Sequence, residues 1–297
     1  MKCQGFGLAA VADLNLRATP EPPAQATDGR AMAATSRSTQ WVAEEFDRRS
    51  ATYDGSEMHR WQAQKAARLL DIQPGQRILD IATGTGLAAR AVVELAEGTS
   101  VVGIDVSRRM LEVARDRSDP RRCRYLQANA QRLPFRAVVF DAIMCIAAIP
   151  YLPDLSAALT EWRRVGRSHA AMVFTTPAAD GITAHRLLSQ AAEAHGLALP
   201  NLHAEYGRPD RIRAVVEQLG LTLVWVKRDT FPDQLDDEPR SAFDRVIDYG
   251  FAEPLRTAAD DLREAIFDMY ADLYSAAHRR GDSVHDTLFT RCRLPGA

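Results

Sequence analysis

The stretch RILDIATGTGLAAR, residues 77–90, constrains the fold more than any other part of the chain. A short apolar run leads to Asp80, two glycines stand one residue apart at Gly84 and Gly86, and a helix-like apolar pattern follows. Glycine adopts backbone conformations that other residues avoid, and it lets a ligand approach the main chain. The order strand, glycine turn, helix therefore predicts a βα unit with a ligand at its turn.

Strand-length and helix-length apolar patterns alternate along most of the chain. The predicted strands cover 77–81, 101–105, 123–127, 140–147, 170–175, 221–226 and 287–294, and the helices between and after them cover 87–95, 107–117, 155–165, 182–195, 210–219 and 239–280. Ser107 is placed to cap its helix by accepting a backbone N–H bond. Alternation of this kind predicts an α/β fold with an open, doubly wound, mostly parallel sheet.

The flanking segments suggest the domain organisation. Residues 1–38 are rich in Ala, Thr, Pro, Ser and Gly and are expected to be a disordered N-terminal tail, within which Met32 is a candidate natural start. One domain is expected over 39–297, opening with helices in 39–72. The segments 178–206 and 232–285 are insertions relative to a minimal sheet. We expect them to form a helical cap over the substrate that binds beside the ligand of the glycine turn.

Composition excludes several classes of function. A net charge of -2 and a pI of 6.4 provide no basic field for nucleic acid, which favours a small-molecule substrate. The four cysteines lack C-x-x-C spacing, so we expect no zinc site, no metal and no disulfide framework, and a reduced, cytoplasmic protein. No run approaches the ~20 apolar residues of a membrane span.

The glycine turn by itself fits more than one ligand. Gly84-x-Gly86-x-x-Ala89 satisfies a dinucleotide-binding pattern, and Asp105 lies 105 − 86 = 19 residues after Gly86, where a carboxylate accepts ribose hydroxyl bonds. Any adenosine-containing ligand can use these groups. An NAD(P)-dependent oxidoreductase is therefore one alternative, although the chain has no Y-x-x-x-K pair to support it.

Asp80 favours a positively charged ligand over a pyrophosphate. A carboxylate at the strand tip repels phosphate and attracts an ammonium or a sulfonium group, and S-adenosylmethionine carries both. Asn129 follows the third predicted strand, where a polar side chain can meet an adenine edge. The plainer interpretations are a solvated loop carboxylate for Asp80 and a turn residue for Asn129.

With these residues the sequence resembles the class I S-adenosylmethionine-dependent methyltransferases, in particular the branch of ubiquinone/menaquinone biosynthesis and natural-product enzymes. The resemblance covers roughly residues 46–174, with a weaker part at 208–221. It is carried by Phe46-Asp47, Tyr53-Asp54, His59-Arg60-Trp61, Leu79 to Gly86, Gly103 to Ser107 with Met110-Leu111, Leu133 to Phe135, and Phe140-Asp141. It implies a Rossmann-like sheet of seven strands with the last strand antiparallel.

The resemblance also implies a set of cofactor-binding residues. Asp80 and the turn from Gly84 to Gly86 are implied to hold the methionine part of S-adenosylmethionine, and Asp105 its ribose. Val106 and Met110 are implied to pack on the adenine, with Asn129 and Ala130 at its amino edge. The full set is Tyr53, Asp80, Ala82, Thr83, Gly84, Gly86, Asp105, Val106, Met110, Asn129, Ala130 and Cys145.

Three positions depart from the family pattern. Ala82 replaces the usual first glycine of the loop, a change expected to tighten the turn without blocking it. Asn129 replaces the usual aspartate, and its amide oxygen can still accept a bond from adenine. The residues 166–170, GRSHA, replace a proline-glycine-glycine and are expected to form a connecting turn before the fifth strand.

Methyl transfer from a sulfonium depends mainly on in-line positioning of the acceptor, and a general base is optional. The candidate catalytic residues are His203, which lies near Glu205, and Tyr151; Tyr53 and His59 are further polar groups expected near the pocket. The aromatic positions 243, 249, 251, 267, 270 and 274 are expected to form the cap's own core or an acceptor pocket, with the core favoured.

We therefore predict methyl transfer to an O, C or N atom of a small, moderately hydrophobic metabolite. An RNA or protein methyltransferase is expected to show a basic groove or a tail domain, and neither is visible in the sequence. A methyltransferase fold with a non-methylating role, such as promoting a cyclisation, remains an alternative, and a homodimer is left open.

Overall fold

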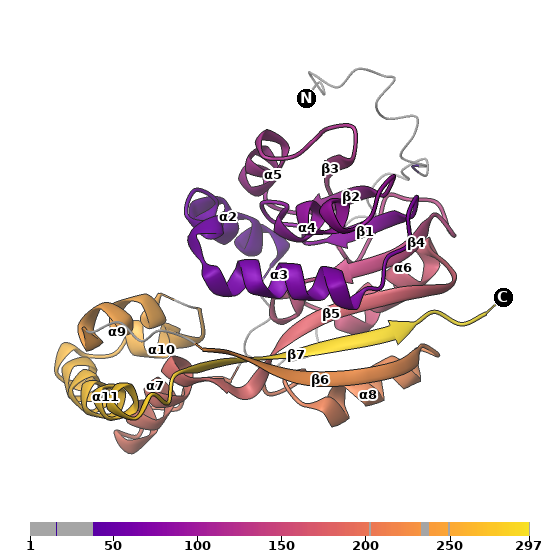
Figure 1. The fold of residues 1–297 in the computed structure, drawn as a ribbon. Coiled ribbons are helices and arrows are strands. Elements are labelled where there is room, and N and C mark those ends of the chain that lie inside the picture. The colour runs from indigo at the N-terminus through magenta and orange to yellow at the C-terminus, as the bar shows by residue number, and fades with distance from the viewer. Residues whose placement is uncertain (1–15, 17–37, 202, 233–237, 249, 297) are drawn as a thin grey trace, which may run out of the picture. The chain divides into compact units, whose positions relative to one another are not determined.

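The computed structural model describes residues 16, 38–201, 203–232, 238–248 and 250–296 (Figure 1). The chain divides into two compact units. The first comprises Met1–Phe174, Val215–Trp225 and Thr290–Ala297, and the second comprises Thr175–Ala214 and Val226–Phe289. Most of the predicted tail, 1–15 and 17–37, lies outside the described residues. Leu16 forms an isolated antiparallel bridge with Phe135.

One sheet contains all seven strands: β1 (Arg77–Ile81), β2 (Ser100–Asp105), β3 (Cys123–Gln127), β4 (Phe140–Cys145), β5 (Gly166–Ile182), β6 (Thr222–Pro232) and β7 (Val284–Arg293). Their order is β3-β2-β1-β4-β5-β7-β6. Strands β1 to β5 pair in parallel, and the last strand is antiparallel, which confirms the predicted fold class. The strand order reverses between β1 and β4, which is where open α/β sheets bind ligands.

The helices of the first unit precede, separate and follow its strands, and several begin with a side-chain N-cap. They are α2 (Thr39–Arg49), η1 (Tyr53–Gly55), α3 (Glu57–Leu69), α4 (Leu87–Leu95), α5 (Arg108–Asp116), η2 (Ile149–Tyr151) and α6 (Leu155–Val165), while α8 (Pro209–Gln218) crosses the boundary between units. Ser107 accepts a hydrogen bond from the Met110 N–H at 3.1 Å, as predicted. Ser38, Ser56 and Asp154 cap α2, α3 and α6 in the same way.

The fifth strand differs most from its prediction. The residues expected as a connecting turn, 166–170, belong to β5, because Phe140 pairs with Gly166 and Ala142 pairs with Ala171. Two steps along β4 thus oppose five along β5, and His169 adopts a φ of 63° within this irregularity. A bulge lets the extra residues leave the ladder while the strand continues. The prediction of a turn was therefore wrong.

Three other element boundaries also differ. Strand β4 ends at Cys145 before Ala147, whose φ of 57° is incompatible with an extended strand. Strand β6 continues to Pro232, beyond the predicted end at residue 226. The single helix expected over 239–280 is divided into α9 (Pro239–Ile247), η3 (Gly250–Ala252), α10 (Glu253–Arg256) and α11 (Asp260–Arg280). Pro254 interrupts it, because proline is tolerated only in the first turn of a helix.

The second unit has a hydrophobic core of its own. Helix α7 (Thr183–Ala194) contributes Leu187, Leu188, Ala191 and Ala192, and α9, α10 and α11 supply most of the rest. Of the six aromatic positions predicted for core or pocket, Phe243, Phe251, Tyr270 and Tyr274 are buried in this core, Phe267 packs against it, and Tyr249 lies outside the described residues. Among the described residues, no helix is both long enough and apolar enough to cross a membrane.

Candidate functional site

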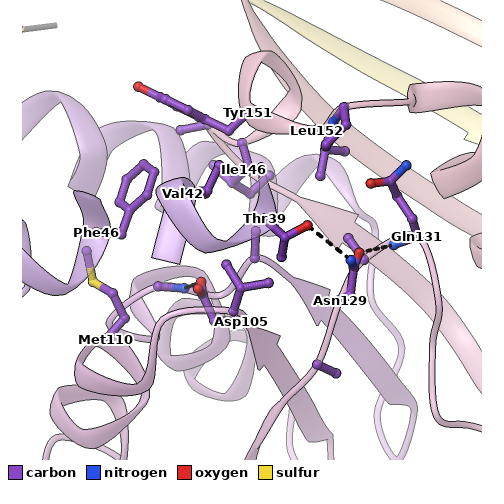
Figure 2. Close-up of a pocket in the computed structure, with 18 of the residues that line it drawn as sticks. Thr39, Val42, Phe46, Asp105, Met110, Asn129, Gln131, Ile146, Tyr151 and Leu152 are labelled. Atoms are coloured by element: carbon purple, nitrogen blue, oxygen red, sulfur yellow. Dashed lines mark hydrogen bonds between the residues drawn. The ribbon is translucent and has the colours of Figure 1, made fainter. Parts of the chain in front are cut away.

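A pocket opens in the first unit at the carboxyl ends of β1, β2, β3 and β4 (Figure 2). Its empty space is about 680 Å³, counted out to the open mouth. Four walls come from the segments that follow these strands, and another comes from α2 and η1, which precede the sheet in sequence. The pocket therefore lies at the position that the reversal of strand order indicates.

Most of the predicted cofactor residues lie in this pocket. It is lined by Tyr53, Ala82, Gly84, Asp105, Val106, Met110, Asn129 and Ala130, and also by the candidate catalytic residue Tyr151. Four predicted residues are buried beside it but do not line it: Asp80, Thr83, Gly86 and Cys145. His203 lines a different cleft, which belongs to the second unit.

The glycine turn has three residues in the left-handed region of backbone conformation. Ala82, Gly84 and Gly86 have φ values of 52°, 56° and 80°. A Cβ on Gly84 would lie 3.9 Å from the Tyr53 ring, so space remains over this residue. A Cβ on Gly86 would lie 2.5 Å from the Tyr125 hydroxyl oxygen, so no space remains there. Gly84 thus serves ligand access, whereas Gly86 serves packing.

Backbone strain occurs at this pocket, as it does at Asp71, Val138 and His169 elsewhere among the described residues. Ala82 and Ala147 both line it, and both adopt positive φ although they carry a Cβ. Conformations of this kind cost roughly 1–2 kcal/mol per residue and persist where the surrounding structure holds them.

Asp105 is buried and organises the floor of the pocket. Its Oδ2 accepts the Gly84 N–H at 2.8 Å, and its Oδ1 accepts the Ser107 N–H at 2.9 Å. Burial raises the pKa of Asp105 to about 6, although these backbone hydrogen bonds favour the charged form. A carboxylate has about four acceptor positions, so Asp105 can still accept two hydroxyl groups from a ligand.

Asp80 lies beneath the turn and is only 1% exposed, so its interpretation as a solvated loop carboxylate was wrong. The Thr83 hydroxyl donates to Asp80 Oδ2 at 2.6 Å. Burial, with a smaller contribution from the nearby Asp105 charge, raises the pKa of Asp80 to about 7, although hydrogen bonds from Thr83 and the Ala89 backbone act to lower it. The carboxylate therefore caps the N-terminus of α4, where a pyrophosphate would otherwise bind.

Helix α2 supplies a wall that the sequence analysis did not assign to the site. Thr39, Val42 and Phe46 recur at helical spacing, so they share one face, and all three line the pocket (Figure 2). Asp47 holds this helix in place. Its Oδ1 accepts the Ser107 hydroxyl at 2.6 Å and the Arg109 N–H at 3.0 Å, both at the N-terminus of α5.

Asp54 holds the segment that carries Tyr53. Its carboxylate accepts the Thr85 hydroxyl from the glycine turn, Arg90 Nη2 at 3.1 Å from α4, and the Arg117 guanidinium at the end of α5. The side chain is 15% exposed. Asp54 thus joins η1 to three elements around the pocket, and it fixes the place of the neighbouring Tyr53.

Aromatic rings crowd one end of the pocket. Phe46 meets Tyr151 edge to face at 5.0 Å and Tyr53 at 6.3 Å, and Tyr53 stacks on His59 at 4.2 Å. The electron-rich faces of such rings attract cations. The Arg49 guanidinium already lies 5.2 Å from the Phe46 ring centroid and 5.9 Å from that of Tyr53, so these two rings hold a cation of the protein itself.

Asn129 is positioned by both ends of its amide. Its Oδ1 accepts the Gln131 N–H at 2.8 Å, and its Nδ2 donates to the Thr39 hydroxyl at 3.4 Å (Figure 2). It is thus a turn residue and also lines the pocket, so the two interpretations of the sequence are compatible. In the described part of the chain, no cluster of three or more His, Cys, Asp or Glu side chains could hold a metal ion.

Comparison with known proteins finds a family similarity over part of the chain. Residues 79–174 match the family described as "Methyltransferase domain". Demethylmenaquinone methyltransferase of Thermus thermophilus is 39% identical over 108 residues, which is 36% of this chain and 49% of the relative. Malonyl-[acyl-carrier protein] O-methyltransferase of Serratia marcescens is 32% identical over 146 residues, which is 48% of this chain and 55% of the relative. The chain thus spans about half the length of these curated relatives.

Solved structures share the fold over most of the chain. The structure of a complex between the Haloferax volcanii Trm112 methyltransferase activator and a methyltransferase matches with a TM-score of 0.56 and 22% identity, covering 86% of this chain and 98% of the other. The [4+2]-cyclase SpnF matches with a TM-score of 0.56 and 15% identity, covering 90% and 100%. These solved structures show a shared fold, and the sequence match shows that residues 79–174 are similar to a methyltransferase domain.

Proposed function

We propose that the chain is an S-adenosylmethionine-dependent methyltransferase that acts on a small-molecule acceptor. The observation that carries this proposal is the capped glycine turn: Asp80 occupies the N-terminus of α4, and Asp105 lines the pocket beside it. Two buried carboxylates favour a cationic adenosine ligand and disfavour a pyrophosphate. The NAD(P) alternative is thereby disfavoured.

The pocket residues fit this cofactor by their chemistry. Asp105 would accept the ribose hydroxyls, and Gly84, where no Cβ blocks approach, would lie against the methionine part beside Thr83. Val106 and Met110 would flank the adenine, with Asn129 and Ala130 at its edge. The bound cofactor supplies a methyl group on a positively charged sulfur, and the Tyr151 ring would stabilise that charge.

The acceptor is proposed to be a moderately hydrophobic metabolite. The name of the Thermus thermophilus relative, demethylmenaquinone methyltransferase, and the absence of a basic charge excess in this chain support this. Tyr151 lines the pocket and is the proposed acid–base group of the first unit, and His203 is a candidate of the second. The second unit is proposed to act as the helical cap for the acceptor, and a cytoplasmic, homodimeric enzyme remains part of the proposal.

Isothermal titration of the full chain tests the cofactor. S-adenosylmethionine and its demethylated product, S-adenosylhomocysteine, are expected to bind, whereas NAD is expected not to compete. Binding of NAD in place of both would refute the proposal, and a chain that binds both but never transfers a methyl group would favour the non-methylating alternative.

The preference for the methylated cofactor is expected to increase with pH. Asp105 and Asp80 ionise with pKa values of about 6 and about 7, so between about pH 5 and about pH 7.5 both carboxylates acquire charge. A sulfonium gains from that charge and a neutral thioether does not. The ratio of the two affinities should shift toward S-adenosylmethionine by about 5-fold over this range, and Asp80→Asn should flatten the shift. A constant ratio would contradict the electrostatic argument.

Asp54→Asn is expected to weaken S-adenosylhomocysteine binding by about 10-fold. The amide cannot accept from Thr85, Arg90 and Arg117 together, so the segment with Tyr53 loses its fixed place. Asp119→Asn, which breaks the exposed 3.0 Å pair with Arg121, is the matched control and should leave affinity unchanged. Equal effects of the two variants would show that Asp54 has no positioning role.

A further inference from the structure

The second unit contains a cleft of its own, lined by residues that do not line the cofactor pocket. Its empty space is about 790 Å³, again counted out to the mouth. Its walls are the end of β5, helix α7, the residues Pro200, Asn201 and His203, and Phe251 from η3. Every lining residue belongs to the second unit, so the cleft can be considered by itself.

Helix α7 presents two different faces. Leu187, Leu188, Ala191 and Ala192 are buried in the core of the unit. The other face lines the cleft and carries, at helical spacing, His185, Arg186, Ser189, Gln190 and Glu193. An ordinary outer face would meet only solvent, but this one places an imidazole and uncharged polar groups along a concave surface.

Three rings form the inner wall of the cleft. The His185 ring lies parallel to that of His203 at 5.9 Å, with 12° between the planes, and against Phe251 at 4.6 Å. Burial, together with the nearby His203 and His285, lowers the pKa of His185 to about 3. The imidazole of His185 is therefore neutral at physiological pH and offers one donor and one acceptor.

The loop that carries His203 is held by hydrogen bonds. The amide of Asn201 donates to the Ala179 carbonyl at 2.9 Å and accepts the His203 N–H at 2.9 Å. The Ala179 N–H in turn donates to the Gly207 carbonyl at 2.9 Å. A cleft whose walls are fixed in this way binds a ligand with little loss of conformational entropy.

The charges at the cleft nearly cancel. Arg228 pairs with Asp286 and also with Asp180, at 3.2 Å, while Arg186 and Glu193 are exposed, so these five groups together carry one negative charge. A phosphorylated or polyanionic ligand would gain nothing from such a site. Ser189, Gln190 and the neutral imidazole of His185 can instead form hydrogen bonds with uncharged polar groups of a ligand.

From this cleft we infer a binding site in the second unit for an uncharged aromatic compound that carries a hydroxyl group. The ring wall provides edge and face contacts for the aromatic part, and the imidazole and side-chain amide receive the hydroxyl. None of the residues that line this cleft is among those proposed to hold the cofactor.

Titration of the full chain with β-naphthol tests this site. β-Naphthol is expected to bind about 5-fold more tightly than naphthalene, which lacks the hydroxyl, and than decahydro-β-naphthol, which lacks the aromatic ring. Naphthyl phosphate should bind more weakly than β-naphthol. Saturation with S-adenosylhomocysteine should leave all these affinities unchanged, so the result is independent of the proposed activity.

Two variants assign the binding to the cleft. Gln190→Trp places a bulky ring in the cleft from an exposed position and should abolish binding without disturbing the core. His185→Phe should make β-naphthol and naphthalene bind equally, whereas His195→Phe, on an exposed histidine outside the lining, should change nothing. Equal binding of β-naphthol and naphthalene by the unaltered chain, or full binding by Gln190→Trp, would overturn the inference.

Discussion

Replacing Asp105 with alanine is expected to lower the affinity for S-adenosylhomocysteine by about 100-fold or more, because two charge-assisted hydrogen bonds are each worth about 1.5–3 kcal/mol. The carboxylate is proposed to accept the ribose hydroxyls, and it also holds the Gly84 and Ser107 N–H groups. Its removal thus takes away a ligand contact and loosens the turn at once. Titration calorimetry on the folded variant measures the effect.

Two companion variants separate these contributions. Asp105→Asn keeps one acceptor oxygen but turns an amide N–H toward a backbone donor, so an intermediate loss is expected. Asp116→Ala changes an exposed aspartate at the end of α5 and should leave affinity unaltered. If Asp105→Ala folds and still binds within about 3-fold of the unaltered chain, the ribose must lie elsewhere.

The order of elements around the site could be predicted from the sequence because it depends on local pattern. The strand, the glycine turn and Asp105 lie within one βα repeat, and parallel pairing brings the ends of β1 and β2 together. The N-cap at Ser107 is also local, since its bond spans three residues. Such features follow from periodicity and from the chemistry of a single turn.

The wall formed by α2 and the anchors Asp47 and Asp54 could not be predicted in this way. Asp47 contacts Ser107 across 60 positions of sequence, and Asp54 contacts Thr85 across 31. Nothing in the local pattern indicates such partners. The helical spacing of Thr39, Val42 and Phe46 predicts a shared face but does not say what that face covers.

The β5 bulge was missed for a different reason. The glycine and polar residues at 166–169 have the composition of a turn, and only pairing with β4 shows that the strand begins there. His203 illustrates a third limit. The sequence places it in a loop near Glu205, and nothing in the local pattern indicates that its ring lies against that of His185, 18 residues earlier in a helix.

Gly86→Ala is expected to destabilise the first unit by about 2–5 kcal/mol, which combines backbone strain with steric overlap. The residue has a φ of 80°, and a Cβ there would lie 2.5 Å from the Tyr125 hydroxyl oxygen. Gly75 is a matched control, because its φ is 78° and a Cβ there would meet no atom within 4 Å. Urea unfolding of Gly75→Ala therefore measures the strain alone, and the difference between the two variants measures the overlap.

The overlap can be relieved from the other side. Tyr125→Phe removes the clashing oxygen, at the cost of its 2.8 Å hydrogen bond with Ser118. In the Gly86→Ala background this second change should restore about 1 kcal/mol or more, so the two substitutions should be less than additive. The residual contact at 3.1 Å and the positive φ would remain, which limits the recovery. Equal destabilisation by Gly75→Ala and Gly86→Ala would show that Gly86 is required for its backbone conformation and not for packing against Tyr125.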